Sequence, residues 1–223
     1  MKTSLTLALG MTIAADQTRV VIIDPSIAGG AFGIGEPPPS AGTKSQKSGI
    51  RYHPELPITF LSRPGSLGAL DTIEAIIDDA NRERAELILI DAHSLNRAEI
   101  ELLARFTSLV IAVVPAGVIS FRSLPPFLET LRELRALPGR TFSVLAVMTG
   151  VGVTRGKEAE LERHTQKQLR PIISAGIFPH DESWRVAISK GELPPPPPPK
   201  SFMESNLQLI AKDVMDSIAK ATL

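Results

Sequence analysis

The sequence predicts a doubly wound α/β fold, a three-layer arrangement in which a mostly parallel sheet has helices on both faces. Short and almost uniformly apolar runs alternate along the chain with longer amphipathic stretches. Apolar runs of this kind are typical of strands that are covered on both faces. Their strict alternation with helices implies right-handed β-α-β units.

Six runs, each too short for a helix and rich in β-branched residues or leucine, are the expected strands. They lie at Arg19–Ile23, Ile58–Leu61, Leu87–Ile90, Leu109–Val114, Val144–Met148 and Gly176–Phe178. Amphipathic periodicity predicts the helices that connect them. These lie at Ser66–Arg84, Arg97–Phe106, Leu124–Leu137, Lys157–Pro171 and Ser183–Lys190.

Both ends of the chain are predicted to be helical as well. Leu5–Ala15 is apolar but is interrupted by Thr6 and Gly10 and follows no basic leader, which favours a core helix over a secretory signal. Ser201–Thr222 has apolar residues at helical spacing, and its polar face mixes acidic and basic side chains. Because anionic lipid favours a basic excess, we expect this helix to pack on the domain or on a partner, not on a membrane.

Two segments interrupt the alternation. Gly29–Gly49 is rich in Gly, Pro, Ser and Lys and predicts a long loop, whose role the sequence leaves open. Pro194–Pro199 predicts an extended spacer of roughly 19 Å at ~3.1 Å per residue. We therefore expect one domain at residues 1–193, a spacer at 194–200 and a C-terminal helix at 201–223.

Composition excludes several classes of function. The 223 residues include no cysteine, which rules out disulfides, thiolate metal sites and cysteine nucleophiles. Lys plus Arg and Asp plus Glu both number 24, so the overall charge does not favour obligate wrapping of nucleic acid. No apolar run reaches the ~18 residues of a membrane-spanning helix. We expect a cytoplasmic protein.

Ligands of doubly wound sheets bind beyond the carboxyl ends of the strands, so the polar residues that follow each run are candidates for a site. They are Asp24, Asp91, Pro115, Thr149 and Pro179–Asp181. An Asp after an apolar strand is typical of a carboxylate that holds a Mg²⁺-bound water. It is equally typical of an ordinary turn with Asp as a helix cap, so Asp91 is compatible with both.

Lys2-Thr3-Ser4 directly precedes the first predicted helix. In a phosphate-binding loop a lysine contacts the phosphates and the next hydroxyl binds Mg²⁺ at the start of a helix. The tripeptide alone is common, but here a helix and then a strand that ends at Asp24 follow it in the order such a site needs.

Together these segments resemble the ParA/MinD ATPases, the deviant Walker A branch of the SIMIBI class of P-loop ATPases. Val20–Pro25 is similar to their second-strand Asp motif, Leu87–Asp91 to their Walker B strand and Leu109–Pro115 to the strand that follows. Phe178–Ser183 is similar to the MinD segment that flanks the nucleotide base, and Ala187, Gly191 and Glu192 recur at matching spacing. The resemblance covers nearly the whole chain.

The resemblance implies ATP and Mg²⁺ as cofactors and assigns five residues to the phosphates and the metal. Lys2 would contact the phosphates, Thr3 would bind Mg²⁺, and Ser4 would lie near the α-phosphate. Asp24 would orient or activate the attacking water, and Asp91 would lie in the outer shell of the metal. Lys2 and Asp24 are thus the expected catalytic residues.

The resemblance also implies that Pro179 and Asp181 lie near the adenine. It further implies a first strand, a glycine-rich arc and a cross-dimer lysine that would precede Met1; we expect ATP hydrolysis once that loop is in place. Either the start is assigned too far downstream or the chain is a degenerate copy. Ser26 and His93 also depart from the family pattern.

The expected function is ATP-dependent partition of plasmids or chromosomes, or intracellular positioning, through a homodimer that forms with ATP. The resemblance raises two further partners, non-specific DNA and a ParB-like activating protein. A basic run whose residues alternate with glutamates is the candidate DNA surface, or else an ion-paired face: Arg155, Lys157, Arg163, Lys167 and Arg170. Two alternatives stay open: a non-catalytic interaction protein of the same fold, and a P-loop enzyme of small-molecule metabolism.

Overall fold

The computed structural model describes residues 2–24, 49–62, 70–92, 97–115, 118–136, 142–151, 163, 167, 173–179 and 181–221. The chain divides into two compact units. The first unit holds Met1–Leu102 and Asp181–Pro196, and the second holds Leu103–His180 and Pro197–Leu223. Most of the loop predicted at Gly29–Gly49 lies outside the described residues, and so does most of the helix predicted at Lys157–Pro171. Ser26 and His93 also lie outside them.

The first unit contains a four-stranded sheet in the order β2-β3-β1-β4. Its strands are β1 (Val20–Asp24), β2 (Ile50–Tyr52), β3 (Ile58–Ser62) and β4 (Leu87–Ile90). β3 and β4 both pair with β1 in parallel, whereas β2 is antiparallel to β3. Every residue of β1 is buried, as expected of an apolar central strand.

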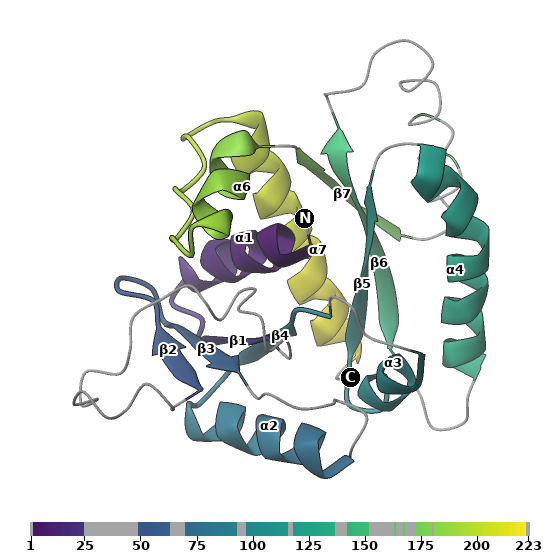
Figure 1. The fold of residues 1–223 in the computed structure, drawn as a ribbon, viewed down its shortest axis with the longest axis horizontal. Coiled ribbons are helices and arrows are strands. Elements are labelled where there is room, and N and C mark those ends of the chain that lie inside the picture. Colours follow the sequence, from purple (N-terminus) through teal and green to yellow (C-terminus); the bar gives the residue numbers. More distant parts are fainter. Residues whose placement is uncertain are drawn as a thin grey trace. The chain divides into compact units, whose positions relative to one another are not determined.

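Helices cover this sheet on both sides. α1 (Lys2–Ala14) and α2 (Leu70–Arg82) lie on opposite sides of the strands in Figure 1. α1 packs against β1, and a Cβ added at Gly10 would lie only 2.8 Å from Ile22 Cδ1. The missing side chain therefore lets the helix approach the strand closely. α6 (Glu182–Ser189) packs in turn against α1.

The second unit contains a three-stranded parallel sheet of β5 (Leu109–Pro115), β6 (Ser143–Val151) and β7 (Ile173–Pro179), in that order. α4 (Val118–Ala136) and α7 (Phe202–Ala221) lie on opposite sides of it in Figure 1. α7 packs against β7 beside Gly176, where a Cβ would lie 3.2 Å from Ile210 Cγ1. Gly176 has φ +128°, a value that glycine adopts without strain, next to a register shift in the β6–β7 pairing.

The predicted fold class is confirmed: parallel sheets are flanked by helices, and all six expected strands form, with ends displaced by at most three residues. β2 was not predicted, because a three-residue edge strand has no distinctive apolar pattern. The helix expected from Leu124 begins at Val118 and contains Pro125 and Pro126. Because prolines are typical of the first turn of a helix, Pro125 and Pro126 favoured a helix start near Leu124, which is six residues too late. α3 spans Arg97–Leu103.

In the part of the chain that the structure describes, every helix is too short or too polar to cross a membrane.

His53 closes the turn between β2 and β3. Its Nδ1 accepts the backbone N–H groups of Glu55 and Leu56, each at 3.1 Å, and this requires the neutral ring. Burial lowers the pKa of His53 below its usual 6.5, and the Glu55 carboxylate opposes this only in part. The lowered pKa means that this turn contributes its full stability above about pH 6.5 and loses it as the pH falls toward the folded-state pKa.

We therefore expect the urea midpoint of the wild-type protein to fall between about pH 7.5 and about pH 5.5 by more than that of a His53→Asn variant. Asparagine retains an acceptor for the two N–H groups but does not titrate. The measurement is urea unfolding of both proteins at the two pH values. Equal pH dependence would show that His53 remains neutral or makes no contribution.

Candidate functional site

The clearest contact at the predicted site joins the first turn of α1 to the end of β4. Thr3 Oγ1 donates a hydrogen bond to Asp91 Oδ2 at 2.5 Å, between residues that are 88 positions apart in sequence. Asp91 is 1% exposed, and its backbone N–H donates to the carbonyl of Ile23 at 2.9 Å. This second bond fixes Asp91 against the neighbouring strand β1. The structure therefore brings together the two residues predicted to serve the metal.

Asp24 lies at the end of that same neighbouring strand. It is the last residue of β1, it is 0% exposed, and it stands in register with Ser62 of β3. Ile23 and Ile90 are partners in the β1–β4 ladder, so Asp24 and Asp91 follow paired positions on adjacent strands. Burying two carboxylates so close together is costly unless positive charge or hydrogen bonds compensate them. Carboxylate oxygens at two adjacent strand ends are groups of the kind that a Mg²⁺ site uses.

The N-terminus of α1 adds groups that suit an anion. The helix begins at Lys2, and its first N–H groups have no acceptor within the helix. The helix dipole places partial positive charge at this end, where the exposed Lys2 adds a full charge. Thr3 and Ser4 are half-buried in the same turn. An anion at this end would lie next to the Thr3–Asp91 pair.

The oxygen groups at this site suit the Mg²⁺ ion that the resemblance implies. Among the described residues, three or more His, Cys, Asp or Glu side chains do not gather as a ligand cage. Mg²⁺ does not require one, since it usually keeps several waters and takes one or two protein oxygens together with phosphate. The Thr3 hydroxyl, supported by the Asp91 carboxylate, therefore fits Mg²⁺ better than a metal that needs several protein ligands.

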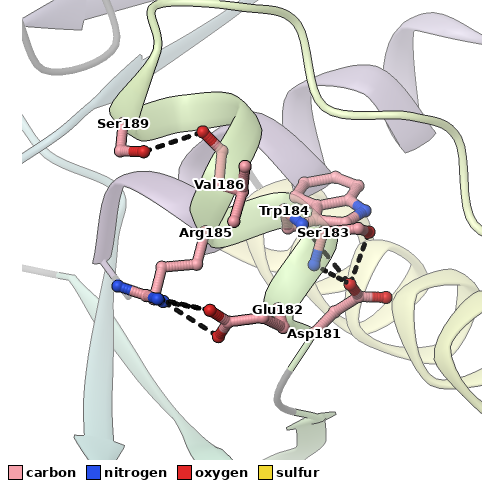
Figure 2. A network of polar contacts seen from close by, with 7 residues as sticks. All are labelled: Asp181, Glu182, Ser183, Trp184, Arg185, Val186 and Ser189. Atoms are coloured by element: carbon pink, nitrogen blue, oxygen red, sulfur yellow. Dashed lines mark hydrogen bonds and ion pairs between the residues drawn. The ribbon is translucent and has the colours of Figure 1, made fainter.

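Asp181 has a defined local function at the start of α6. It is the N-cap, and its Oδ1 accepts hydrogen bonds from Ser183 N at 2.8 Å, Trp184 N at 3.3 Å and Ser183 Oγ at 2.6 Å (Figure 2). The following turn carries an exposed ion pair between Glu182 and Arg185. Asp181 belongs to the first unit with Thr3, Asp24 and Asp91. Its predicted role near adenine stays a prediction, while its capping role is visible.

The second unit brings three other strand ends together. Thr149 of β6 is in register with Pro115 of β5 on one side and with Phe178 of β7 on the other. Pro179 is the residue after Phe178 and ends β7. Thr149 is 0% exposed, and within the described residues its Oγ1 has no hydrogen-bond partner. A buried hydroxyl that has no described hydrogen-bond partner, at the carboxyl end of a parallel sheet, is a candidate ligand contact. The sequence placed Thr149 at a strand end but assigned it no role.

Comparison with solved structures identifies the fold. MinD, the cell division ATPase of Pyrococcus furiosus, aligns with a TM-score of 0.67 and 13% identity over 96% of this chain and 93% of that chain. A complex of a McdA variant with ATP, from Cyanothece, aligns with a TM-score of 0.63 and 17% identity over 98% of this chain and 91% of that chain. At such identities the similarity is one of fold.

A metabolic enzyme shares that fold. Cobyrinic acid a,c-diamide synthase from Mycobacterium smegmatis aligns with a TM-score of 0.66 and 14% identity, over 96% of this chain and 88% of that chain. No family model and no curated protein sequence matches the chain.

Proposed function

We propose that this chain, whose fold is that of the ParA/MinD-type P-loop ATPases, binds ATP with Mg²⁺ at the first unit and, once the phosphate-binding loop is in place, hydrolyses it as a switch in partition or intracellular positioning. The observation that carries the proposal is the hydrogen bond between Thr3 and the buried Asp91, beside the buried Asp24. It unites a hydroxyl at a helix N-terminus with two carboxylates at adjacent strand ends, which are groups that a magnesium nucleotide site uses.

Each residue would then have a distinct task. Lys2 would contact the phosphates from the start of α1, and Ser4 would lie near the α-phosphate. Thr3 would bind the metal through its hydroxyl, and Asp91 would orient that hydroxyl through the observed bond. Asp24 would hold and activate the attacking water. When bound, Mg²⁺ would supply positive charge that offsets the charge of the phosphates.

The partners proposed for this switch are a second copy of the chain, non-specific DNA and a ParB-like activating protein. Support for nucleotide binding comes from the McdA–ATP complex, which shares the fold. Of the basic run predicted to contact DNA, Arg163 and Lys167 are helical, while Arg155, Lys157 and Arg170 lie outside the described residues. Salt-sensitive binding of DNA in the presence of ATP is the expected behaviour.

A second candidate function is a P-loop enzyme of small-molecule metabolism. The observation in its favour is the fold similarity to cobyrinic acid a,c-diamide synthase. The two functions differ in what accelerates turnover. A partition ATPase is expected to respond to DNA or a protein partner, whereas a metabolic enzyme requires a small-molecule acceptor. An inert interaction protein of this fold would not turn over ATP at all.

Nucleotide binding can be measured through Trp184, the only tryptophan in the chain, which is buried beside the Asp181 cap. We expect ATP with Mg²⁺ to change its fluorescence saturably in the full-length protein. Thr3→Ala should weaken Mg²⁺-dependent binding at least about tenfold, which corresponds to about 1.4 kcal/mol. Isothermal titration calorimetry provides an independent readout.

Thr12→Ala is the matched control, because Thr12 lies on the same helix and, among the described residues, its hydroxyl donates to the backbone carbonyl of Ala8, at 2.8 Å. It should bind ATP as the wild-type protein does. If the wild-type protein ignores ATP, or if both variants weaken binding equally, the proposed site is wrong.

A further inference from the structure

The last helix of the second unit, α7, packs one side on its sheet and exposes another. Its packing contacts are with β7, β6 and β5, and its buried residues include Leu207, Ile210 and Val214. Two large apolar side chains of the same helix are nevertheless exposed, Phe202 at 63% and Leu209 at 59%. Among the described residues, no other large apolar side chain is as exposed.

Phe202 and Leu209 share one face of the helix. Seven residues at about 100° each return to within about 20° of the starting direction. Asp213 and Asp216 come four and seven residues after Leu209, so they lie on this face as well. Lys200 is exposed just before the helix begins at Phe202. These five residues, which we name the α7 face, run from a positive charge through two apolar side chains to two negative charges.

We propose that the α7 face binds the same face of a second copy of the chain, with the two helices antiparallel. A two-fold axis between Phe202 and Leu209 would set Phe202 of each copy against Leu209 of the other. The same axis would bring Lys200 of each copy near Asp213 of the other, where opposite charges attract. A parallel pair would instead set lysine beside lysine and aspartate beside aspartate.

Charge favours a second copy over a membrane or a nucleic acid. Anionic lipids and DNA phosphates both attract basic surfaces, whereas this face carries Asp213 and Asp216. Lys220 follows Asp216 by one turn, and in the antiparallel pair it would extend past the beginning of the other helix. The chain has 24 basic and 24 acidic residues, so its overall charge does not oppose self-association.

The size of the surface predicts a weak dimer. A single pair of helices buries less than the roughly 1,200 Å² of a standard interface. We therefore expect a dissociation constant on the order of tens of micromolar. The contact uses neither nucleotide nor Mg²⁺, so it is separate from the ATP-dependent dimer proposed above, and it can be tested whether or not the chain binds ATP.

The first test is sedimentation velocity of the full chain without nucleotide, from about 5 to about 500 μM, because mass action makes a weak dimer concentration-dependent. We expect the average mass of the wild-type protein to rise toward twice that of the monomer. Leu209→Asp should raise the dissociation constant at least about tenfold, since its charge would be buried against Phe202 of the other copy.

Gln208→Asp is the matched control for this substitution. It adds the same charge at an exposed position of α7 that is rotated by about 100° from Leu209. It should change the dissociation constant less than about threefold, because its carboxylate stays in water. Circular dichroism checks that both variants retain the wild-type fold.

A charge exchange tests the antiparallel orientation. Lys200→Glu and Asp213→Lys each turn both attractive pairs of the dimer into repulsive ones, so each variant alone should associate roughly tenfold more weakly. An equimolar mixture of the two should associate as the wild-type protein does. In the mixed dimer the two new charges meet each other, and the unchanged Lys200 and Asp213 meet as well.

Three results would each overturn the proposal: a wild-type protein that stays monomeric over the whole range, equal weakening by Leu209→Asp and Gln208→Asp, or no recovery in the mixture. Leu209-dependent binding to vesicles of phosphatidylserine and phosphatidylcholine, without self-association, would also overturn it and would assign the α7 face to a membrane surface.

Discussion

Replacement of Asp24 by asparagine is expected to lower the rate of ATP hydrolysis at least about a hundredfold while nucleotide binding persists. Activation of a water by a positioned carboxylate contributes about 10²–10⁴ to rate, and asparagine retains the shape of the side chain without its basicity. Asp24 is fully buried at the end of β1, so bulk water does not easily replace its charge. The measurement is single-turnover hydrolysis with saturating ATP and Mg²⁺.

Asp16→Asn is the matched control, since it makes the same chemical change at an exposed position just beyond α1. Wild-type hydrolysis by Asp24→Asn would exclude Asp24 as the residue that activates water.

Replacement of Ile210 by aspartate is expected to destabilise the second unit by about 4 kcal/mol or more, the range of a charge buried without a partner. Ile210 is 0% exposed, and its Cγ1 would lie 3.2 Å from a Cβ at Gly176 of β7. The new carboxylate would replace an apolar contact between α7 and the strand. Urea unfolding followed by circular dichroism measures the loss.

Leu209→Asp provides the matched control one residue earlier on the same helix. Leu209 is 59% exposed, so the same charge stays in water and should change stability by no more than about 0.5 kcal/mol. If Ile210→Asp does not fold at all, Ile210→Ala supplies a graded measurement, with an expected loss of about 2–5 kcal/mol. Equal stability of Ile210→Asp and Leu209→Asp would mean that α7 does not pack on the sheet as described.

The strands could be predicted because their signal is local. β1, with the sequence Val-Val-Ile-Ile-Asp, is apolar up to a terminal carboxylate, and the structure buries all five residues. β2 and the early start of α4 were not predicted, because their signal is not local. Ile50–Tyr52 pairs only through contact with β3, and α4 extends before Pro125 and Pro126 despite their lack of N–H groups. Tertiary context decides such elements.

Part of the candidate site could likewise be predicted from sequence, and part became visible only in the structure. That Asp24 and Asp91 lie at the same edge of a sheet follows from sequence, because the carboxyl ends of parallel strands meet at one edge. That β1 and β4 are neighbours became visible only in the structure. The sequence assigned Asp181 only a place near adenine, and its capping of α6 became visible in the structure. Thr149 shows what sequence cannot supply: its burial and its hydroxyl without a described partner depend on strands β5 and β7 on either side.

The amino-acid sequence by itself determined the α/β class, the order of helices and strands and the extended proline run, since each depends on apolar periodicity or on ring chemistry within a few residues. Tertiary structure alone decided the hydrogen bond between Thr3 and Asp91 and the close approach of α7 to Gly176. These features join residues far apart in the chain or depend on burial, and both arise only when the elements pack.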